Sequence, residues 1–176
     1  MLRPLTKEAP ELVDAWTLLA EAQLQLGQTR AATETLRGAV QRFPTHPEIR
    51  PRLAEVLLSQ QKFAEVDDLL KDRKEPPRRA LHYQHAQALL GLGRVPEAER
   101  ELRQEIIHFP DHLEAWGALA AVLAGQGRGA QAREVLRESF ARNPGDRARR
   151  IARDTLLAVG DQEGLRLLGL EAAAQP

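Results

Sequence analysis

The histidines are the residues of this sequence whose type and spacing could hold a metal ion or carry a proton. His82 and His85 lie three residues apart, a spacing that metal sites on helices use. The sequence has no Cys, and no further His or carboxylate joins this pair in phase, so a packing role is favoured for His82. His108 and His112 flank a Phe-Pro-Asp turn, where we expect capping of a helix end or exposure to solvent. The sequence therefore predicts no metal site.

Motifs for catalysis are missing as well. The sequence has no Gly-rich phosphate loop, no Ser nucleophile elbow and no His-Glu-x-x-His pair. Carboxylates are plentiful, but they are interspersed with Arg along expected helices, which is typical of solvated helix faces. We predict a protein without catalytic residues and without a cofactor.

The charge is balanced, at 25 basic and 25 acidic residues, so no overall field attracts nucleic acid or an anionic membrane. A cluster of Arg within residues 146–154 is interrupted by Asp and has no aromatic neighbour for stacking on bases, which disfavours nucleic-acid binding. No apolar run reaches the roughly 20 residues of a membrane span. The expected partner is therefore a protein or a peptide.

The amino-acid composition gives only weak indications of the source organism and the cellular compartment. Lys occurs four times and Arg supplies the remaining basic residues, which together with abundant Ala and Leu indicates a GC-rich, bacterial source. The absence of Cys fits either redox compartment. The location is left open between the cytoplasm, the default, and the periplasm.

A repeated sequence motif predicts the helices that must position any functional residue. Leu-Arg, six residues and Pro recur at 2–10, 36–44, 102–110 and 136–144, with successive prolines 34, 66 and 34 residues apart. A shortened copy at 69–77 divides the long interval. A fixed period of this length predicts stacked supersecondary units in place of one closed core.

Each unit is expected to contain two helices, A and B. In the first unit, Trp16 begins an apolar stripe at helical spacing, and Gly27 can adopt the left-handed conformation that ends helix A. Ala20 and Ala32 would let the two helix backbones approach closely. Pro44 ends helix B, because proline has no N–H and disfavours helix in the residue before it.

The phase of these positions resembles the tetratricopeptide repeat. The resemblance rests on four copies, at 13–46, 47–78, 79–112 and 113–146. The fourth copy carries the family pattern at Trp116, Leu119, Ala120, Gly127, Ala132, Leu136 and Pro144. Departures occur in the second and third copies, where Arg50 and His82 replace Trp and Gln61 replaces Gly. The resemblance implies an all-α fold, a right-handed superhelix (α-solenoid) of antiparallel helix pairs.

The ends are open to two interpretations each. Residues 1–12 resemble the end of a preceding helix B, from a truncated repeat, or they form an N-terminal extension. Residues 147–176 are expected to form a capping helix and a tail, or the first half of a fifth repeat. In that helix, Ile151, Val159 and either Thr155 or Leu156 are predicted to face inward.

The resemblance implies that the A helices line a concave groove, and the residues that point away from each apolar stripe would form its surface. These candidate binding residues are Asp14, Thr17, Glu21, Leu24, Gln25, Glu48, Arg52, Glu55, Leu58, Ser59, Tyr83, Gln84, Gln87, Leu90, Glu114 and Ala121. Their acidic and apolar first half predicts a basic or amphipathic helical segment as the partner. Small residues in the fourth repeat, among them Gly117, predict room there for a bulky partner element. The alternative is that these are ordinary exposed helix residues and that binding occurs elsewhere.

Family members that grip a C-terminal carboxylate use Lys and Asn in this groove. The matching positions here are Thr17, Glu21, Pro51 and Glu55, so that ligand is disfavoured.

The function predicted from the sequence is a non-catalytic scaffold or adaptor that binds a peptide or a partner helix in its groove. One alternative is the accessory region of a larger multidomain enzyme or signalling protein. Another is a self-association module, which would make the chain a homo-oligomer.

Overall fold

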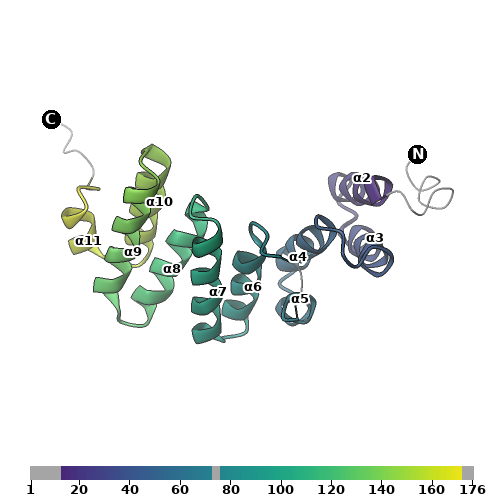
Figure 1. The fold of residues 1–176 in the computed structure, drawn as a ribbon, viewed down its shortest axis with the longest axis horizontal. Helices are drawn as coiled ribbons and strands as arrows, with labels where there is room; N and C mark the ends of the chain where they lie inside the picture. Colours follow the sequence, from purple (N-terminus) through teal and green to yellow (C-terminus); the bar gives the residue numbers. More distant parts are fainter. Residues whose placement is uncertain (1–12, 73–75, 172–176) are drawn as a thin grey trace. The chain divides into compact units, whose positions relative to one another are not determined.

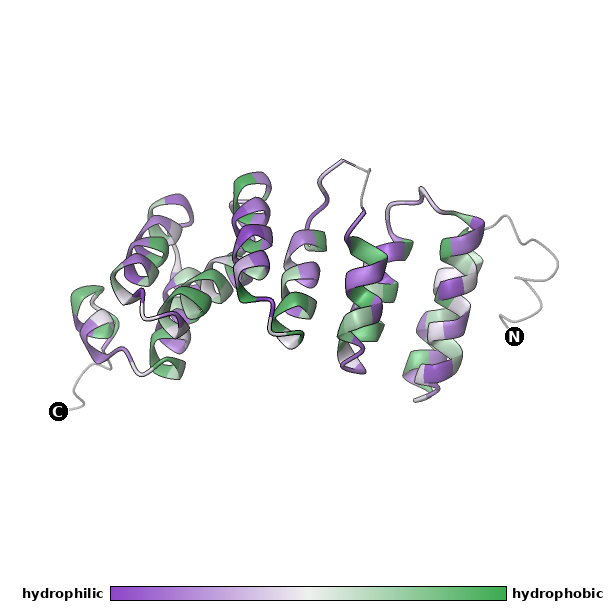
Figure 2. Ribbon diagram, turned by 90° about the horizontal axis from the view of Figure 1, so that it is seen from below, coloured by the Kyte–Doolittle hydropathy of each residue, from purple (hydrophilic) through white to green (hydrophobic). Residues whose placement is uncertain are grey.

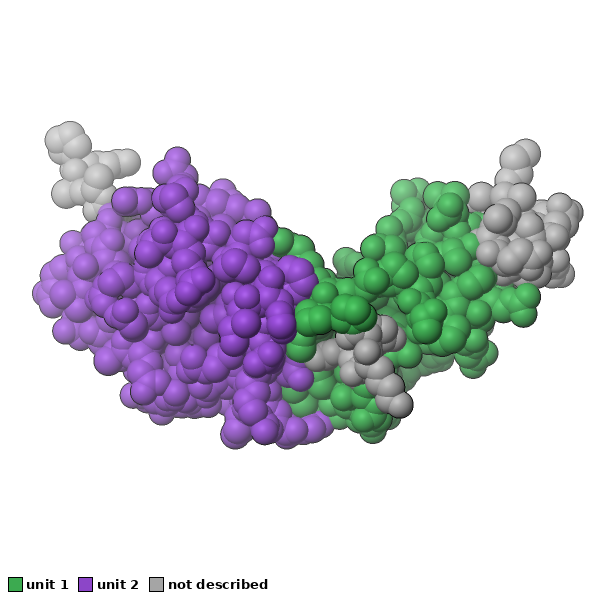
Figure 3. Space-filling view, in the orientation of Figure 1, with its two compact units in different colours: residues 1–92 green, residues 93–176 purple. Residues whose placement is uncertain are grey.

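The computed structural model describes residues 13–72 and 76–171, and the regular structure of these residues is entirely helical. The chain divides into two compact units, residues 1–92 and residues 93–176 (Figure 3). The first unit contains α2 (Val13–Gln25), α3 (Thr29–Arg42), α4 (Ile49–Ser59), α5 (Phe63–Leu70) and α6 (Leu81–Gly91) (Figure 1). The second contains α7 (Val95–His108), α8 (Leu113–Gly125), α9 (Gly129–Arg142), α10 (Asp146–Ala158) and α11 (Gln162–Leu167).

Consecutive helices within each unit pack against one another as antiparallel hairpins. In the first unit α2 packs on α3, α3 on α4, α4 on α5 and α5 on α6, and in the second unit α7 packs on α8 and α8 on α9. The helices carry both hydrophobic and hydrophilic residues along their length (Figure 2), as amphipathic helices between a core and solvent must. The predicted all-α architecture of helix pairs is confirmed. The boundary between the units falls inside the third predicted repeat, and the repeat boundaries themselves remain predictions.

The core of the first unit combines small and large apolar side chains. Ala20 and Ala32 are buried between α2 and α3, as expected for backbones in close approach, and Leu36, Leu53 and Leu57 fill the space beside them. The ring of Trp16 is only half-buried. It lies over Gly38 of α3, where an added Cβ would come within 2.8 Å of the indole carbon Cζ3. The first tryptophan therefore requires a residue without a side chain on the facing helix.

Trp116 is the largest fully buried side chain among the described residues and lies in the second unit. Its indole N–H donates to the carbonyl oxygen of Pro110 at 2.8 Å, and the Asn143 side-chain amide donates to the same oxygen at 2.7 Å. The turn before α8 is thus fixed by the helix that follows it and by the end of α9. Buried Trp side chains usually have a hydrogen-bond partner of this kind.

The turns between paired helices repeat one backbone motif. Gly27 has a φ of +71°, and its N–H donates to the carbonyl of Leu24 while the next N–H donates to that of Gln23, the Schellman pattern of helix C-termini. The same two bonds recur around Gly127 and Gly160. They also recur around Gln61, which has a φ of +56° although it is not Gly. The expected role of Gly27 is confirmed, and Gln61 preserves the turn in a conformation that favours Gly.

The C-terminal helices differ in one respect from the prediction. Leu156 is buried, and Ile151 and Thr155 are half-buried, but Val159 is 36% exposed, so its predicted inward orientation is wrong. Val159 follows the last residue of α10, and the turn at Gly160 carries it away from the buried side. The predicted remnant of a preceding helix at 2–10 lies outside the described residues.

Candidate functional site

A cleft in the first unit, between α2 and α4, collects many of the predicted binding residues. Its volume is about 300 Å³. It is lined by Thr17, Ala20, Glu21, Leu24, Leu36, Arg52, Glu55, Val56 and Ser59. Six of these nine residues were predicted from their helical phase, and Ala20, Leu36 and Val56 add an apolar floor. We refer to it as the α2–α4 cleft.

One ion pair crosses the α2–α4 cleft. The Arg52 guanidinium of α4 is paired with the Glu21 carboxylate of α2, with both side chains partly exposed. Among the residues described, Glu55 has neither an ion pair nor a hydrogen bond through its side chain, and it is exposed. The cleft therefore carries one carboxylate that is neutralised within the protein and one that is not.

The other predicted residues of the first unit lie outside the α2–α4 cleft. Asp14, Gln25, Glu48 and Gln87 are exposed, Tyr83 and Leu90 are half-buried, Leu58 packs against the core, and Gln84 donates to the Pro51 carbonyl oxygen at 3.1 Å. Gln84 thus links α6 to α4, so its amide is already used in holding neighbouring helices together. Helical phase alone does not separate such linking residues from residues that face open space.

The small residues of the fourth repeat do not leave the space that was predicted. Gly117 of α8 is buried, and an added Cβ would lie 3.0 Å from both Ile151 Cγ2 and Thr155 Oγ1 of α10. The expectation of room for a partner is therefore wrong at Gly117, because the chain's own α10 packs there. Ala121 of the same helix is half-buried.

Glu114, another predicted binding residue, also faces α10. Its carboxylate pairs with the Arg147 guanidinium at 2.6 Å. Burial raises the pKa of the Glu114 carboxyl, but a backbone N–H and Arg147 lower it by more, so the net shift is downward. Glu114 therefore remains ionised as part of the contact between α8 and α10.

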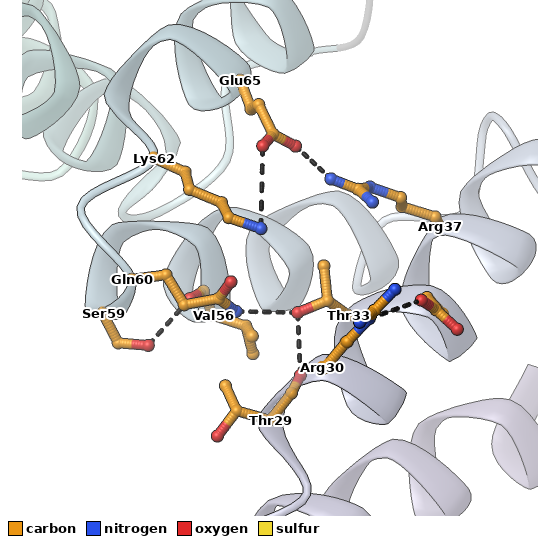
Figure 4. Close-up of polar contacts among 10 residues, drawn as sticks. Thr29, Arg30, Thr33, Arg37, Val56, Ser59, Gln60, Lys62 and Glu65 are labelled. Carbon is orange, nitrogen blue, oxygen red and sulfur yellow. Dashed lines mark hydrogen bonds and ion pairs between the residues drawn. The ribbon is translucent and has the colours of Figure 1, made fainter.

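A second cleft in the first unit lies between α3, α4 and α5 and has a volume of about 350 Å³. It is lined by Arg37, Val40, Gln41, Leu53, Leu57, Glu65, Asp68 and Leu69. Its charged rim is paired within the protein: Arg37 and Lys62 both contact the Glu65 carboxylate (Figure 4), and Lys71 pairs with Asp68 at 2.6 Å. Sequence reasoning missed this cleft because candidate binding residues were sought on the A helices alone. Its neutralised rim leaves little unmatched charge for a ligand.

Two of the histidines are buried and paired with carboxylates, whereas His108 is exposed, as one of its expected roles requires. His85 Nε2 lies 2.7 Å from Asp67 Oδ1, which links α6 to α5, and His112 Nδ1 lies 2.6 Å from Glu105 Oε1, which links the start of α8 to α7. His112 is buried and makes no cap hydrogen bond through its side chain, so the expectation of capping or exposure is wrong for it. Glu105 is fully buried, an exception to the predicted solvation of the carboxylates.

Metal ligands are not assembled by these pairs. No group of three or more His, Cys, Asp or Glu that could hold a metal ion occurs within residues 13–72 and 76–171.

A half-buried carboxylate, that of Glu99, links the B helices of the second unit. Glu99 of α7 accepts from Arg128 Nη1 at 2.7 Å, just before α9, and from Arg103 Nη2 at 2.8 Å. Burial raises the pKa of the Glu99 carboxyl, whereas Arg128 and Arg103 lower it by more, so the net shift is downward. Glu99 is therefore ionised in the folded protein.

Antiparallel helix hairpins that share one turn motif, with a cleft between the first helices of neighbouring hairpins, define a helical repeat protein. Family models of the tetratricopeptide repeat match residues 13–73 and residues 83–147. The chain belongs to the tetratricopeptide repeat family, whose fold is an α-solenoid and which generally provides a scaffold for protein interaction.

Similar proteins agree on the fold. YrrB, described as a TPR protein with an unusual peptide-binding site, aligns with a TM-score of 0.69 at 16% identity over 97% of this chain and 90% of its own. PilW, a type IV pilus biogenesis factor, aligns with a TM-score of 0.68 at 20% identity over 94% of this chain and 79% of its own. At these identities the likeness concerns the fold alone.

A curated relative is much longer than this chain. Cellulose synthase operon protein C of Pseudomonas fluorescens (strain SBW25) is 26% identical over an alignment of 176 positions, which includes 92% of this chain and 13% of that relative. No helix in the described part of the chain is long and apolar enough to cross a membrane.

Proposed function

We propose that this chain is a non-catalytic interaction scaffold that binds a basic segment of a partner protein, as a peptide or a helix, in the α2–α4 cleft. The observation that carries the proposal is Glu55, an unneutralised carboxylate at the wall of a cleft with an apolar floor. A basic and amphipathic segment can place apolar side chains on that floor while its cations face Glu55. An acidic or C-terminal carboxylate ligand would meet repulsion from the same side chain.

Glu55→Lys is the substitution that tests this proposal. Within the described part of the chain, the exposed Glu55 side chain has no ion pair or hydrogen bond, so its replacement should leave the chain folded while it reverses the charge at the cleft. Glu21→Lys is less suitable, because it would also break the ion pair with Arg52. Glu34→Lys on α3 is the matched control, since Glu34 is exposed, lies outside the cleft and pairs with the exposed Arg30.

The assay is fluorescence anisotropy with two labelled heptad peptides, one built from Leu and Lys and the other from Leu and Glu. We expect the wild-type chain and Glu34→Lys to bind the Lys peptide and not the Glu peptide. Glu55→Lys should weaken binding of the Lys peptide about tenfold or more, the size of one lost charged contact in a partly exposed site. Equal binding of the Lys peptide by all three proteins would place the site elsewhere.

A wider role within a larger protein is the second candidate. It is favoured by the relative from Pseudomonas fluorescens, of which this chain covers 13%. In that case the cleft would recruit a basic segment to an activity that lies outside these residues. The length of the native reading frame tests this candidate directly.

Self-association is favoured by two exposed leucines of the first unit. Leu18 is 49% exposed and Leu26 is 72% exposed, at and just beyond α2. Light scattering over a concentration series should then show a dimer that Leu18→Glu with Leu26→Glu converts to a monomer. A wild-type chain that stays monomeric at all concentrations would remove this candidate.

A further inference from the structure

We propose that the α2–α4 cleft is a pocket for a single arginine side chain of the partner segment. This inference rests on the proposed function and narrows it, because it assigns hydrogen-bonding roles to three residues, Thr17, Glu55 and Ser59. All three line the cleft, together with the apolar floor.

The two hydroxyls of the cleft can only accept hydrogen bonds from a ligand. Thr17 Oγ1 donates its proton to the carbonyl oxygen of Asp14 at 3.0 Å. Ser59 Oγ donates its proton to the carbonyl oxygen of Val56 at 2.7 Å (Figure 4). A hydroxyl has one proton and two lone pairs, so each oxygen retains lone pairs for a donor from outside. The local helix geometry has therefore made both residues into acceptors.

A third hydroxyl in the same unit already works in this way. Thr33 Oγ1 donates to the carbonyl oxygen of Thr29 at 2.9 Å and accepts from the Gln60 side-chain amide at 2.8 Å (Figure 4). There an N–H donor from the next helix pair fills the free lone pair. In the α2–α4 cleft, the corresponding donor can be supplied by a ligand that displaces water.

The charges of the cleft point to the same ligand chemistry. Arg52 is its only cationic side chain and is already paired with Glu21, whereas Glu55 is not paired. An ionised carboxylate accepts hydrogen bonds and donates none. The lining thus offers the two hydroxyls and the Glu55 carboxylate as acceptors with free capacity, whereas its one cationic donor, Arg52, is paired with the Glu21 carboxylate.

Arginine fits this set better than lysine does. Its planar guanidinium carries five N–H donors in a fixed fork, which can bind a carboxylate and neighbouring hydroxyls together, whereas the lysine ammonium has three donors on one atom. The methylene stem of arginine would lie on Ala20, Leu24 and Val56, which line the same cleft. The volume of about 300 Å³ is enough for one arginine side chain, while the peptide backbone that carries it stays outside the cleft.

The test uses the full chain, labelled with ¹⁵N, and three blocked probe peptides of the sequence Ac-Ala-Leu-X-Leu-Ala-NH₂, where X is Arg, Lys or citrulline. Citrulline has nearly the shape of arginine, but it has no charge and carries an oxygen in place of one NH₂ group, so it has three N–H donors and not five. We expect amide shifts around Thr17, Glu55 and Ser59 with the Arg peptide, and binding of that peptide about tenfold tighter than of the citrulline peptide.

Matched variants assign the individual contacts. Glu55→Gln should reduce the preference for Arg over citrulline to near unity, and Thr17→Val with Ser59→Ala should weaken Arg binding about three- to tenfold. Glu34→Gln, outside the cleft, should change neither value. Thermal unfolding of each variant confirms that it is folded before binding is compared.

The possible outcomes separate this inference from the function on which it rests. Equal binding of the Arg and citrulline peptides, equal binding of Arg and Lys, or an unchanged preference in Glu55→Gln would each overturn the arginine pocket. If the Leu–Lys heptad peptide still binds and Glu55→Lys still weakens that binding about tenfold or more, the proposed function stands without the pocket. If neither the heptad peptide nor the Arg peptide binds, both fall together.

Discussion

Two glycines at the end of α8 should respond to the same substitution with opposite signs. Gly125 is the last residue of the helix, whereas Gly127 follows it with a φ of +76°. An added Cβ would meet nothing within 4 Å at either position, so packing contributes to neither change. The backbone alone decides the result. Gly125→Ala should stabilise the fold by about 0.5–1 kcal/mol, and Gly127→Ala should destabilise it by about 1–2 kcal/mol.

The assay is urea unfolding of the two variants and the wild-type chain, followed both by circular dichroism at 222 nm and by tryptophan fluorescence. Trp116 of the same helix reports on the second unit. The two variants should differ by about 1.5–3 kcal/mol in the free energy of unfolding, provided that the m-values agree. If both substitutions stabilise, or both destabilise by the same amount, the left-handed turn does not carry the energy assigned to it.

Gln61 extends this reasoning to the first unit. It occupies the position of Gly127 in its own turn, with a φ of +56° and an exposed side chain. Gln61→Gly should therefore stabilise the chain by roughly 1 kcal/mol, because it relieves the left-handed strain and removes no contact. Destabilisation in the same urea experiment would show that the Gln61 side chain has a role of its own.

Three further outcomes follow from buried contacts. Trp116→Ala should lower the free energy of unfolding by about 3–5 kcal/mol in urea, and a loss below 1 kcal/mol would contradict its place in the core. Gly91→Ala should destabilise the chain by about 1–3 kcal/mol, because the added Cβ would lie 2.4 Å from Phe63 Cδ2. Phe63→Leu in the same chain should recover part of that loss. If the effects of the two substitutions are purely additive, the predicted clash is refuted. Because the pKa of Glu99 is lowered on folding, its stabilisation is present above the ordinary value of 4.5 and is lost as the pH falls through the lower folded value. Glu99→Gln should therefore flatten the acid limb of stability against pH, and an unchanged limb would show that Glu99 does not contribute to it.

Much of the candidate site could be predicted because helical phase is a local property. Thr17, Glu21 and Leu24 recur on one side of α2, and the period of the repeat carried the same assignment to Arg52 and Glu55 on α4. The prediction failed where a neighbouring element decides exposure. Whether a small residue such as Gly117 faces open space depends on where α10 packs.

Pairing between side chains of different helices could not be predicted from the sequence either. Glu105 and His112 are seven residues apart and belong to different helices, and nothing in their spacing distinguishes them from a solvated carboxylate and a turn histidine. Their pairing depends on the packing of α8 on α7, which brings both side chains out of water. Burial then requires each polar group to find a partner.

The sequence by itself determined the helices, their turns and their order, because hydrophobic period, Pro and left-handed Gly act over a few residues at a time. Only the tertiary structure decided which exposed positions form a cleft, which hydroxyls are left as acceptors and which carboxylates are already neutralised. Those properties depend on the separation of side chains from different helices, and that separation is set by how the helices pack.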